Sequence, residues 1–230
     1  MLSRVLEPEV MDTAEEAADY DSMDHSEVNR RFVNDWSGAC QEWGLDPASR
    51  QKMLDVGTGT ALIPIAFCER FPSLRIEAID LAEEMLKLGA DHLRRSGLSD
   101  RIELNLIDAK RISGDDNVFQ TVISNSIMHH IPEPLNCFTE MLRVLAPGGL
   151  LFVRDLMRPG TDSEVESIVW THAAEATFRQ QQLFRQSLYA ALTVEEVAGL
   201  LERIGLPRES VRATSDRHWT VSCLKTTSGY

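Results

Sequence analysis

The sequence predicts an α/β protein built on a doubly wound, mostly parallel sheet, and three observations lead to this prediction. Between residues 52 and 155, short apolar runs alternate with helix-like segments. A glycine turn directly follows the first of these runs, residues 53–56. Polar residues end the expected strands, namely Asp55, Asp80, Asp108, Asn125 and Asp155. Because ligands of such sheets bind beyond the carboxyl ends of the strands, these residues mark the candidate site.

The chain begins with an acidic segment, residues 1–24, which has few apolar residues. Its acidic residues are Glu7, Glu9, Asp12, Glu15, Glu16, Asp19, Asp21 and Asp24. Two alternatives remain open for this segment, a mobile leader or a lid that orders over a site. A helix is expected next, with Ser26 as its N-cap and its end near Trp43, because apolar residues recur at helical spacing up to Gly44.

Strands and helices then alternate through the centre of the chain. The expected strands are residues 53–56, 74–79, 102–107, 119–124 and 150–153, and the expected helices are residues 61–70, 82–95 and 135–145. Gly97 is expected to end the second of these helices, and Pro147-Gly148-Gly149 is expected to end the third. The alternation calls for a sheet that is covered on both faces.

Beyond Pro159 the pattern becomes helical. The expected helices are residues 162–180, a segment through Leu183 and Tyr189, and residues 194–204, capped by Thr193. Residues 211–214 and 219–225 are expected to close the sheet as an antiparallel hairpin, which makes seven strands. The chain is therefore predicted to be one domain in three parts: a leader and lid helix (1–45), a binding core (46–160), and a helical cover with the hairpin (161–230).

Composition excludes several functional classes. The 230 residues are 43% hydrophobic, enough for one sizeable core. Asp and Glu number 36 against 23 Lys and Arg, a net charge of −13 without a basic run, so no nucleic-acid partner is expected. The 4 cysteines lack metal or disulfide spacing, and no apolar run approaches the roughly 20 residues that span a bilayer. We expect a cytoplasmic monomer or homodimer with a small-molecule substrate and no membrane partner.

The glycine turn matches only part of a dinucleotide-binding pattern. Leu62 stands where the third glycine of G-x-G-x-x-G would be. Asp55 precedes the turn, and a carboxylate there would repel a pyrophosphate and attract a cation. Asp80, about 20 residues past the turn, suits the hydroxyls of an unphosphorylated ribose, although capping the next helix explains it equally well.

The chain resembles the class I S-adenosylmethionine-dependent methyltransferases from about residue 52 to residue 153. The segments that carry the resemblance are Leu-Asp-Val-Gly-Thr-Gly-Thr at 54–60, Ala-Ile-Asp-Leu-Ala-Glu-Glu-Met-Leu at 78–86, Ile-Asp-Ala at 107–109, Asn-Ser-Ile-Met-His-His-Ile at 125–131 and Leu-Ala-Pro-Gly-Gly at 145–149. The resemblance implies a Rossmann-like methyltransferase fold with an N-terminal helical lid and a helical insertion after the fifth strand. It also implies S-adenosyl-L-methionine as cofactor and S-adenosyl-L-homocysteine as product.

The resemblance also implies roles for individual residues. Asp55, Gly57 and Gly59 would surround the methionine part of the cofactor, with Thr58 where relatives commonly have Cys or Ser. The roles implied for the other positions are ribose binding by Asp80, packing on the adenine by Met85 or Leu81, recognition of its amino group by Asp108 with the backbone at Ala109, and contact with the methionine by Asn125 with Ser126.

Three histidines are candidate general bases. His129 and His130 follow the fourth strand, where a neutral imidazole would suit proton removal near pH 7, but the pair is widespread among relatives, and packing or capping explains it as well. His25 lies where the acidic segment meets the first helix, and Tyr20 and Asn29 would line a substrate chamber with it. Ordinary surface polarity is the alternative for these residues.

Two further substrate residues, Asp155 and Arg158, are expected after the fifth strand. Arg158 or Arg154 could bind a carboxylate or phosphate, and an ion pair between Asp155 and Arg158 is the structural alternative. His218, on the turn of the terminal hairpin, could close the chamber. No metal site is expected, because the 6 histidines form no H-E-x-x-H cluster. Two rival functions remain open: a non-methylating enzyme that binds the same cofactor, and a non-catalytic binding module.

Overall fold

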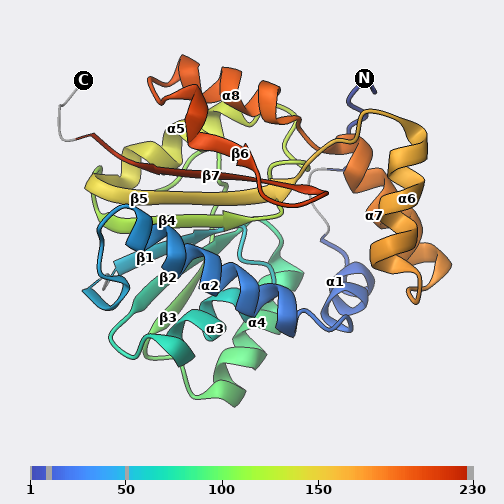
Figure 1. The fold of residues 1–230 in the computed structure, drawn as a ribbon. Helices are drawn as coiled ribbons and strands as arrows, with labels where there is room; N and C mark the ends of the chain where they lie inside the picture. The colour runs from blue at the N-terminus through green and yellow to red at the C-terminus, as the bar shows by residue number, and fades with distance from the viewer. Residues whose placement is uncertain (1, 9–11, 50–51, 227–230) are drawn as a thin grey trace. The chain divides into compact units, whose positions relative to one another are not determined.

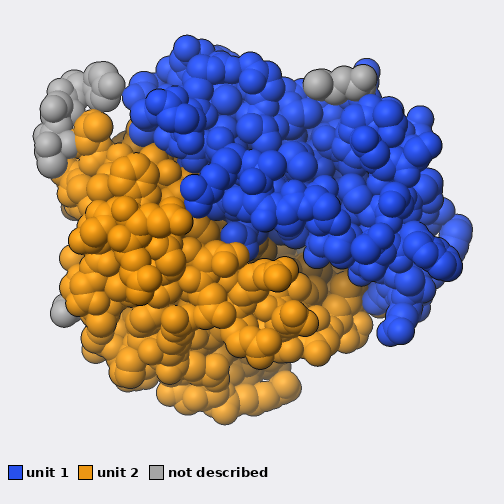
Figure 2. All heavy atoms as spheres, viewed as in Figure 1, with its two compact units in different colours: residues 1–9, 126–135, 153–221 blue, residues 10–125, 136–152, 222–230 orange. Residues whose placement is uncertain are grey.

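The computed structural model describes residues 2–8, 12–49 and 52–226. Contacts divide the chain into two compact units, coloured separately in Figure 2. Unit 1 comprises Met1–Glu9, Ser126–Leu135 and Val153–Val221, and unit 2 comprises Val10–Asn125, Asn136–Phe152 and Ser222–Tyr230. The division into parts 1–45, 46–160 and 161–230 stays a prediction. No described helix has the length and apolar character needed to cross a membrane.

The sheet has seven strands, as the sequence predicted, and their order is β3-β2-β1-β4-β5-β7-β6 (Figure 1). The strands are β1 (Lys52–Val56), β2 (Arg75–Asp80), β3 (Ile102–Leu106), β4 (Phe119–Asn125), β5 (Leu145–Leu156), β6 (Val211–Ala213) and β7 (His218–Leu224). β1 pairs in parallel with β2 and β4, and β2 pairs in parallel with β3. β6 and β7 form the expected antiparallel hairpin. The order places the carboxyl ends of β1, β2, β3 and β4 at one edge of the sheet.

Unit 2 is held together by an aromatic core under the sheet. Helix α2 (Ser26–Glu42) carries Trp36, which is fully buried and meets the ring of Phe67 edge-on at 5.0 Å. Phe67 belongs to α3 (Leu62–Arg70), which directly follows the glycine turn. The expected N-cap of α2 was one residue off, because His25 occupies the cap position and Ser26 begins the helix. Packing α3 against α2 anchors the helix whose N-terminus faces the turn.

The acidic segment contains an ordered helix, α1 (Ala14–Asp21), which is part of unit 2 and packs against α4 there. Thr13 and Glu16 cap it reciprocally, which satisfies two backbone donors. Its buried face packs Ala17 against Ala82 and Met85 at the start of α4 (Glu83–Ser96). Residues 14–21 are therefore ordered, which agrees with the alternative of an ordered segment and not with that of a mobile leader. Residues 9–11 lie outside the residues that the structure describes.

One predicted helix end was wrong. Pro147-Gly148-Gly149 does not separate α5 (Leu135–Val144) from the fifth strand, because β5 begins at Leu145 and runs through all three residues. The reason is pairing with the distant chain end: Gly148 N–H donates to the Lys225 carbonyl (2.8 Å), and Lys225 N–H donates to the Gly149 carbonyl (2.9 Å). A Cβ at position 149 would lie 2.7 Å from the Ala146 carbonyl oxygen, so only glycine fits there.

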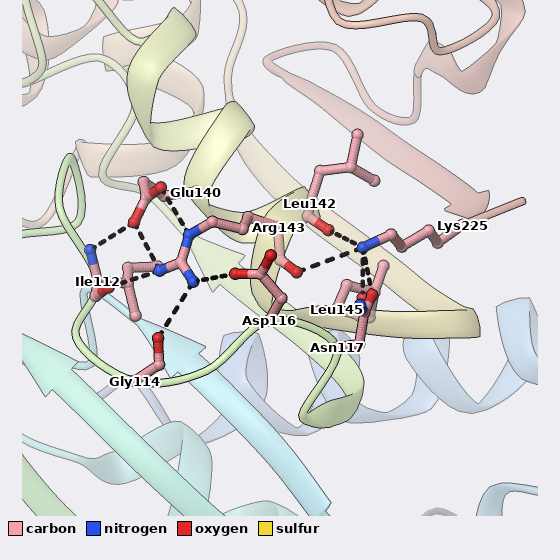
Figure 3. Close-up of polar contacts among 9 residues, drawn as sticks. All are labelled: Ile112, Gly114, Asp116, Asn117, Glu140, Leu142, Arg143, Leu145 and Lys225. Atoms are coloured by element: carbon pink, nitrogen blue, oxygen red, sulfur yellow. Dashed lines mark hydrogen bonds and ion pairs between the residues drawn. The ribbon is translucent and has the colours of Figure 1, made fainter. Parts of the chain in front are cut away.

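Two cations fasten the end of α5 to its surroundings in unit 2 (Figure 3). The Arg143 guanidinium binds the Glu140 and Asp116 carboxylates and the Ile112 carbonyl. The Lys225 ammonium donates to the carbonyls of Leu142 (2.7 Å) and Leu145 (2.8 Å), which the helix end leaves without helical donors. The end of α5 is thus stabilised by side-chain donors, whereas the sequence predicted that Gly148 and Gly149 would end this helix.

The remaining helices belong to unit 1. They are α6 (Asp162–Ala173), α7 (Phe178–Ala190) and α8 (Val194–Arg203). A short 3₁₀ turn lies in each unit, Pro47–Ser49 in unit 2 and Arg208–Ser210 in unit 1. The single helix expected over residues 162–180 is wrong, because Thr177 caps a new helix through its hydroxyl and Gln180. α6 and α7 pack around Val165, Val169 and Leu188. The predicted cap of α8 by Thr193 is confirmed.

Candidate functional site

The glycine turn after β1 is fixed by hydrogen bonds to β2. Gly57 and Gly59 have φ angles of 75° and 56°, the left-handed region that favours glycine. The backbone N–H groups of Gly57 and Thr58 donate to the Ile79 carbonyl at 2.8 and 3.0 Å. Asp80 accepts from Gly59 N–H at 2.7 Å through one oxygen and from Ala82 N–H at 2.9 Å through the other. Asp80 therefore braces both the turn and the start of α4, so the capping alternative is part of its role.

Asp55 supplies a buried carboxylate beside this turn. It is 2% exposed, and its Oδ2 atom, like Thr58 Oγ1, has no hydrogen-bond partner among the described residues. Burial raises the pKa of Asp55 to about 7, opposed by the Thr58 hydroxyl and aided by the nearby charge of Asp80. A buried carboxylate oxygen without a donor is costly unless a ligand supplies one. A Cβ built at Gly59 meets nothing within 4 Å, so open space borders the turn. Both observations fit a ligand that carries an ammonium group.

Tyr20 lies near these carboxylates, and His25 stacks on it. Burial raises the pKa of Tyr20, as do the charges of Asp80, Asp21 and Asp55, so its phenol stays protonated. The Tyr20 and His25 rings stack with centroids 4.5 Å apart, and His25 Nε2 lies 3.0 Å from the Tyr20 carbonyl oxygen. The structure therefore brings Tyr20 next to the acids of the turn, with His25 stacked on its ring.

The other predicted cofactor residues in unit 2 lie at neighbouring strand ends. Asp108 accepts from the backbone N–H of Lys110 (2.8 Å) and lies 3.0 Å from its ammonium. Although burial opposes it, these Lys110 contacts lower the pKa of Asp108, which keeps its carboxylate ionised. Ala109 follows at the same loop, partly buried. Met85 is only 6% exposed, whereas Leu81 is 39% exposed, so Leu81 has the apolar surface free for an aromatic ring. Asn125 ends β4.

Helices α2 and α3 border a groove of about 660 Å³ in unit 2. Its lining includes His25 and Asn29 from the predicted substrate chamber, together with Asp24 and Leu62. Asn29 is 9% exposed. The groove is mixed in character, since apolar Val33 and Ile65 lie beside these polar groups. It has room for a compact organic molecule.

Unit 1 contains a second group of polar residues, centred on Asp155. This residue is fully buried and accepts from the N–H groups of Met128 (2.5 Å) and Leu156 (2.6 Å) and from His129 Nδ1 (2.5 Å). Although burial opposes both shifts, the Asp155–His129 pair lowers the pKa of Asp155 and raises that of His129. Burial and the neighbouring His129 lower the pKa of His130 to about 4. Asp155 thus holds His129, which argues against its predicted substrate role.

Arg158 also has a structural role. It is 6% exposed and donates to the Glu196 carboxylate (2.5 Å) and to the carbonyls of Leu2 (3.1 Å) and Ala191 (2.7 Å). The alternative of an Asp155–Arg158 ion pair was therefore wrong about the partner, which is Glu196. These contacts also argue against binding of a substrate anion by Arg158.

Three further residues of unit 1 complete the comparison with the sequence. Ser126 has a φ angle of 60° and donates its N–H to the Arg154 carbonyl at 2.9 Å. Burial, together with Arg217 and Arg154, lowers the pKa of His218 to about 4, and its Nδ1 lies 2.9 Å from Ser215 Oγ. Sequence reasoning missed Glu7, whose Oε1 lies 3.1 Å from His130 Nδ1. Glu7 carried no signal because it is one of many acids in the leader.

Three features define a class of nucleoside-binding α/β proteins. They are a seven-stranded sheet with an antiparallel last strand, a glycine turn preceded by an acidic residue, and an acidic residue at the next strand end that suits ribose hydroxyls. Residues 53–149 match the family described as "Methyltransferase domain". This segment carries every predicted cofactor residue from Asp55 to Ser126. Residues 53–149 therefore form a methyltransferase domain that is similar to the class I S-adenosylmethionine-dependent methyltransferases.

Relatives and solved structures agree with this assignment. Methyltransferase GfsG of Streptomyces halstedii is 32% identical over 54% of this chain and 45% of its own length. The malonyl-[acyl-carrier protein] O-methyltransferase of Geobacter sulfurreducens is 32% identical over 66% of this chain and 53% of its own length. The plantazolicin methyltransferase BpumL, solved with a triazolic desmethylPZN analog and SAH, shares the fold with a TM-score of 0.70 at 14% identity, over 91% of this chain and 89% of its own. The chain thus spans about half the length of these curated relatives.

Proposed function

We propose that this protein transfers the methyl group of S-adenosyl-L-methionine to a small-molecule acceptor and releases S-adenosyl-L-homocysteine. The observation that carries the proposal is the buried Asp55 carboxylate beside an open glycine turn, because its Oδ2 atom has no hydrogen-bond partner among the described residues. A cation relieves the cost of that buried charge, whereas a pyrophosphate would increase it. S-adenosylmethionine carries an ammonium group and a sulfonium, and it has no phosphate.

The residues of unit 2 divide the work of binding the cofactor. Asp55 and Thr58 accept from the ammonium group, and Gly57 and Gly59 leave room for the methionine chain. The further assignments are the ribose hydroxyls to Asp80, the adenine face to Leu81, the adenine edge to Asp108 with Ala109, and the methionine moiety to Asn125. When bound, the cofactor supplies an electrophilic methyl group on sulfur. The protein then has to align the acceptor and exclude water.

We assign the acceptor to the groove between α2 and α3. Asn29 offers hydrogen bonds, and His25, which stacks on Tyr20, is the base that we propose for an acceptor that must lose a proton. His129 and His130 are not included as bases, because His129 is held by Asp155 and both face Glu7. The names of the relatives favour acceptors such as an acyl group on a carrier or a natural product. The acidic net charge supports an enzyme that acts without nucleic acid, and we propose that it works in the cytoplasm.

The test is a turnover assay on the purified full chain. The protein is incubated with S-adenosylmethionine and a panel of acceptors with hydroxyl, amine, thiol and activated carbon groups. Mass spectrometry then follows S-adenosylhomocysteine together with an acceptor that has gained one methyl group. We expect both products with at least one acceptor, their loss in Asp55→Asn, and their retention in Asp91→Asn, an exposed control on α4.

Each rival function predicts a different result in the same assay. A non-methylating enzyme would change the acceptor without S-adenosylhomocysteine or any gain of a methyl group. A binding module would retain the cofactor and produce nothing with any acceptor. Either result would contradict the proposal of methyl transfer.

A further inference from the structure

Three side chains of unit 1, Glu7, His129 and His130, form a cluster that the proposed methyl transfer does not use. Their potential ligand atoms all lie within 4.8 Å of one another. Glu7 Oε1 lies 3.5 Å from His129 Nε2 and 3.1 Å from His130 Nδ1. We call these three residues the Glu7 cluster.

Two atoms of the Glu7 cluster face each other without hydrogen bonds. Glu7 Oε1 and His130 Nδ1 are buried and have no hydrogen-bond partner among the described residues. The Glu7 side chain is only 10% exposed. The Pro8 carbonyl accepts a hydrogen bond from the His130 ring, which places a proton on Nε2 and leaves a lone pair on Nδ1. A carboxylate and a lone pair held 3.1 Å apart repel each other unless a proton or a metal cation lies between them.

The remaining member, His129, is oriented in the way that metal-binding histidines are. Its Nδ1 donates to Asp155, so the Nε2 lone pair is directed toward Glu7. A carboxylate behind a ligating imidazole is the usual outer contact of such residues, and here the Met128 and Leu156 N–H groups fix that carboxylate. Ser187 Oγ lies 3.4 Å from Glu7 Oε2, which leaves Oε1 for the cluster.

We propose that Glu7, His129 and His130 bind a divalent transition-metal ion, with Zn²⁺ as the cation that best matches two imidazoles and one carboxylate. Ligand bonds of about 2.0–2.2 Å in tetrahedral geometry place ligand atoms roughly 3.4 Å apart. The distances of 3.1 and 3.5 Å lie on either side of this value. Three protein ligands leave a fourth position for water. The two charges of the ion match the carboxylates of Glu7 and Asp155.

The neighbourhood of the cluster is compatible with a cation. Arg4 is the nearby positive group, and its guanidinium donates to the carbonyls of Ala190, Pro132 and Ile131, so it does not neutralise Glu7 by direct contact. The His130 side chain is 21% exposed, which gives an ion a route from solvent. A bound ion would tie the segment of Glu7 to the loop after β4, in addition to the Val5 N–H bond to the Tyr189 carbonyl (3.1 Å). Metal binding should therefore stabilise unit 1.

The test is metal titration of the full chain after treatment with a chelator. Co²⁺ reports ligand geometry through its visible absorption, and Zn²⁺ competition with a chromophoric chelator gives the affinity. We expect one ion per chain, a Co²⁺ spectrum of low coordination number, and a higher melting temperature with Zn²⁺. Because removing even an outer contact weakens metal sites by about 10- to 100-fold, Glu7→Gln and His130→Ala should each weaken binding by at least about 100-fold.

His172→Ala is the matched control, because His172 is another histidine of unit 1, paired with Asp216 and Arg217. It should bind metal as the wild type does. Glu7→Gln keeps the size of the side chain, and circular dichroism checks that each variant is folded. A wild-type affinity weaker than about 10 μM, or a stoichiometric site that survives both cluster substitutions, would overturn the proposal.

Discussion

Gly59→Val is expected to weaken binding of S-adenosylhomocysteine by at least about 100-fold, a loss of roughly 2.7 kcal/mol. The added methyl groups would enter the open space beside the turn, where a Cβ meets nothing within 4 Å in the ligand-free protein. Folding should suffer less than binding, because a β-branched residue at a φ of 56° costs about 1–3 kcal/mol. Isothermal titration measures the affinity, and calorimetric melting measures the stability.

Gly38→Val is the control for this prediction. Gly38 lies in α2, its φ is not positive, and a Cβ there also meets nothing within 4 Å. The control should bind the ligand within about twofold of the wild type. If Gly59→Val retained wild-type affinity, the open space beside the turn would not be where the ligand lies.

Asp55→Asn is expected to weaken binding of S-adenosylhomocysteine by about 10- to 150-fold at pH 8, because a hydrogen bond to a charged group contributes roughly 1.5–3 kcal/mol. Burial raises the pKa of Asp55 to about 7, so the ligand-free wild type must lose a proton to accept the ammonium group. The wild-type affinity should therefore rise by up to about tenfold per pH unit toward pH 7 and then level off. The Asp55→Asn variant should not show this rise of affinity with pH.

The same pKa predicts an opposite effect on folding. In the unfolded chain Asp55 ionises near pH 4, whereas the ligand-free folded state keeps the proton up to about pH 7. Stability therefore falls as pH rises from about 4 to 7 and stays lower above that window. At pH 8 the ligand-free Asp55→Asn variant should be more stable than the wild type, by on the order of 1 to 4 kcal/mol.

Melting curves at pH 5 and pH 8 check this effect. The stability of the variant relative to the wild type should increase between the two pH values. A variant that is less stable than the wild type at pH 8 would show that a protein group, and not a ligand, partners Asp55.

Local patterns explain why the cofactor side of the fold was predictable. The run from Met53 to Val56, the turn at Gly57 and Gly59, and Asp80 at the next strand end each carry their signal within a few residues. The glycines have the positive φ angles that the pattern requires, and Asp80 contacts the turn directly. Such features depend on backbone conformation and strand polarity, which short segments determine.

Contacts between distant residues explain what was missed. β5 runs through Pro147-Gly148-Gly149 because it pairs with Lys225, far along the chain. Arg158 binds Glu196, and Asp155 binds His129, whereas proximity in sequence had suggested that Asp155 and Arg158 pair.

The Glu7 cluster was invisible for the same reason. Metal-site patterns in sequence depend on short spacings between the ligands. Glu7 lies near the N-terminus, far along the chain from His129 and His130. A lone glutamate among many acids gives no signal of its own.

The most direct test of the central claim is a parallel calorimetric titration of the ligand-free chain with S-adenosylhomocysteine and with NAD⁺. Both ligands contain adenosine, but only the first presents an ammonium group, and only the second presents a pyrophosphate to Asp55. We expect micromolar or tighter binding of S-adenosylhomocysteine and at least about 100-fold weaker binding of NAD⁺. Equal or tighter binding of NAD⁺, or no binding of S-adenosylhomocysteine, would contradict the account.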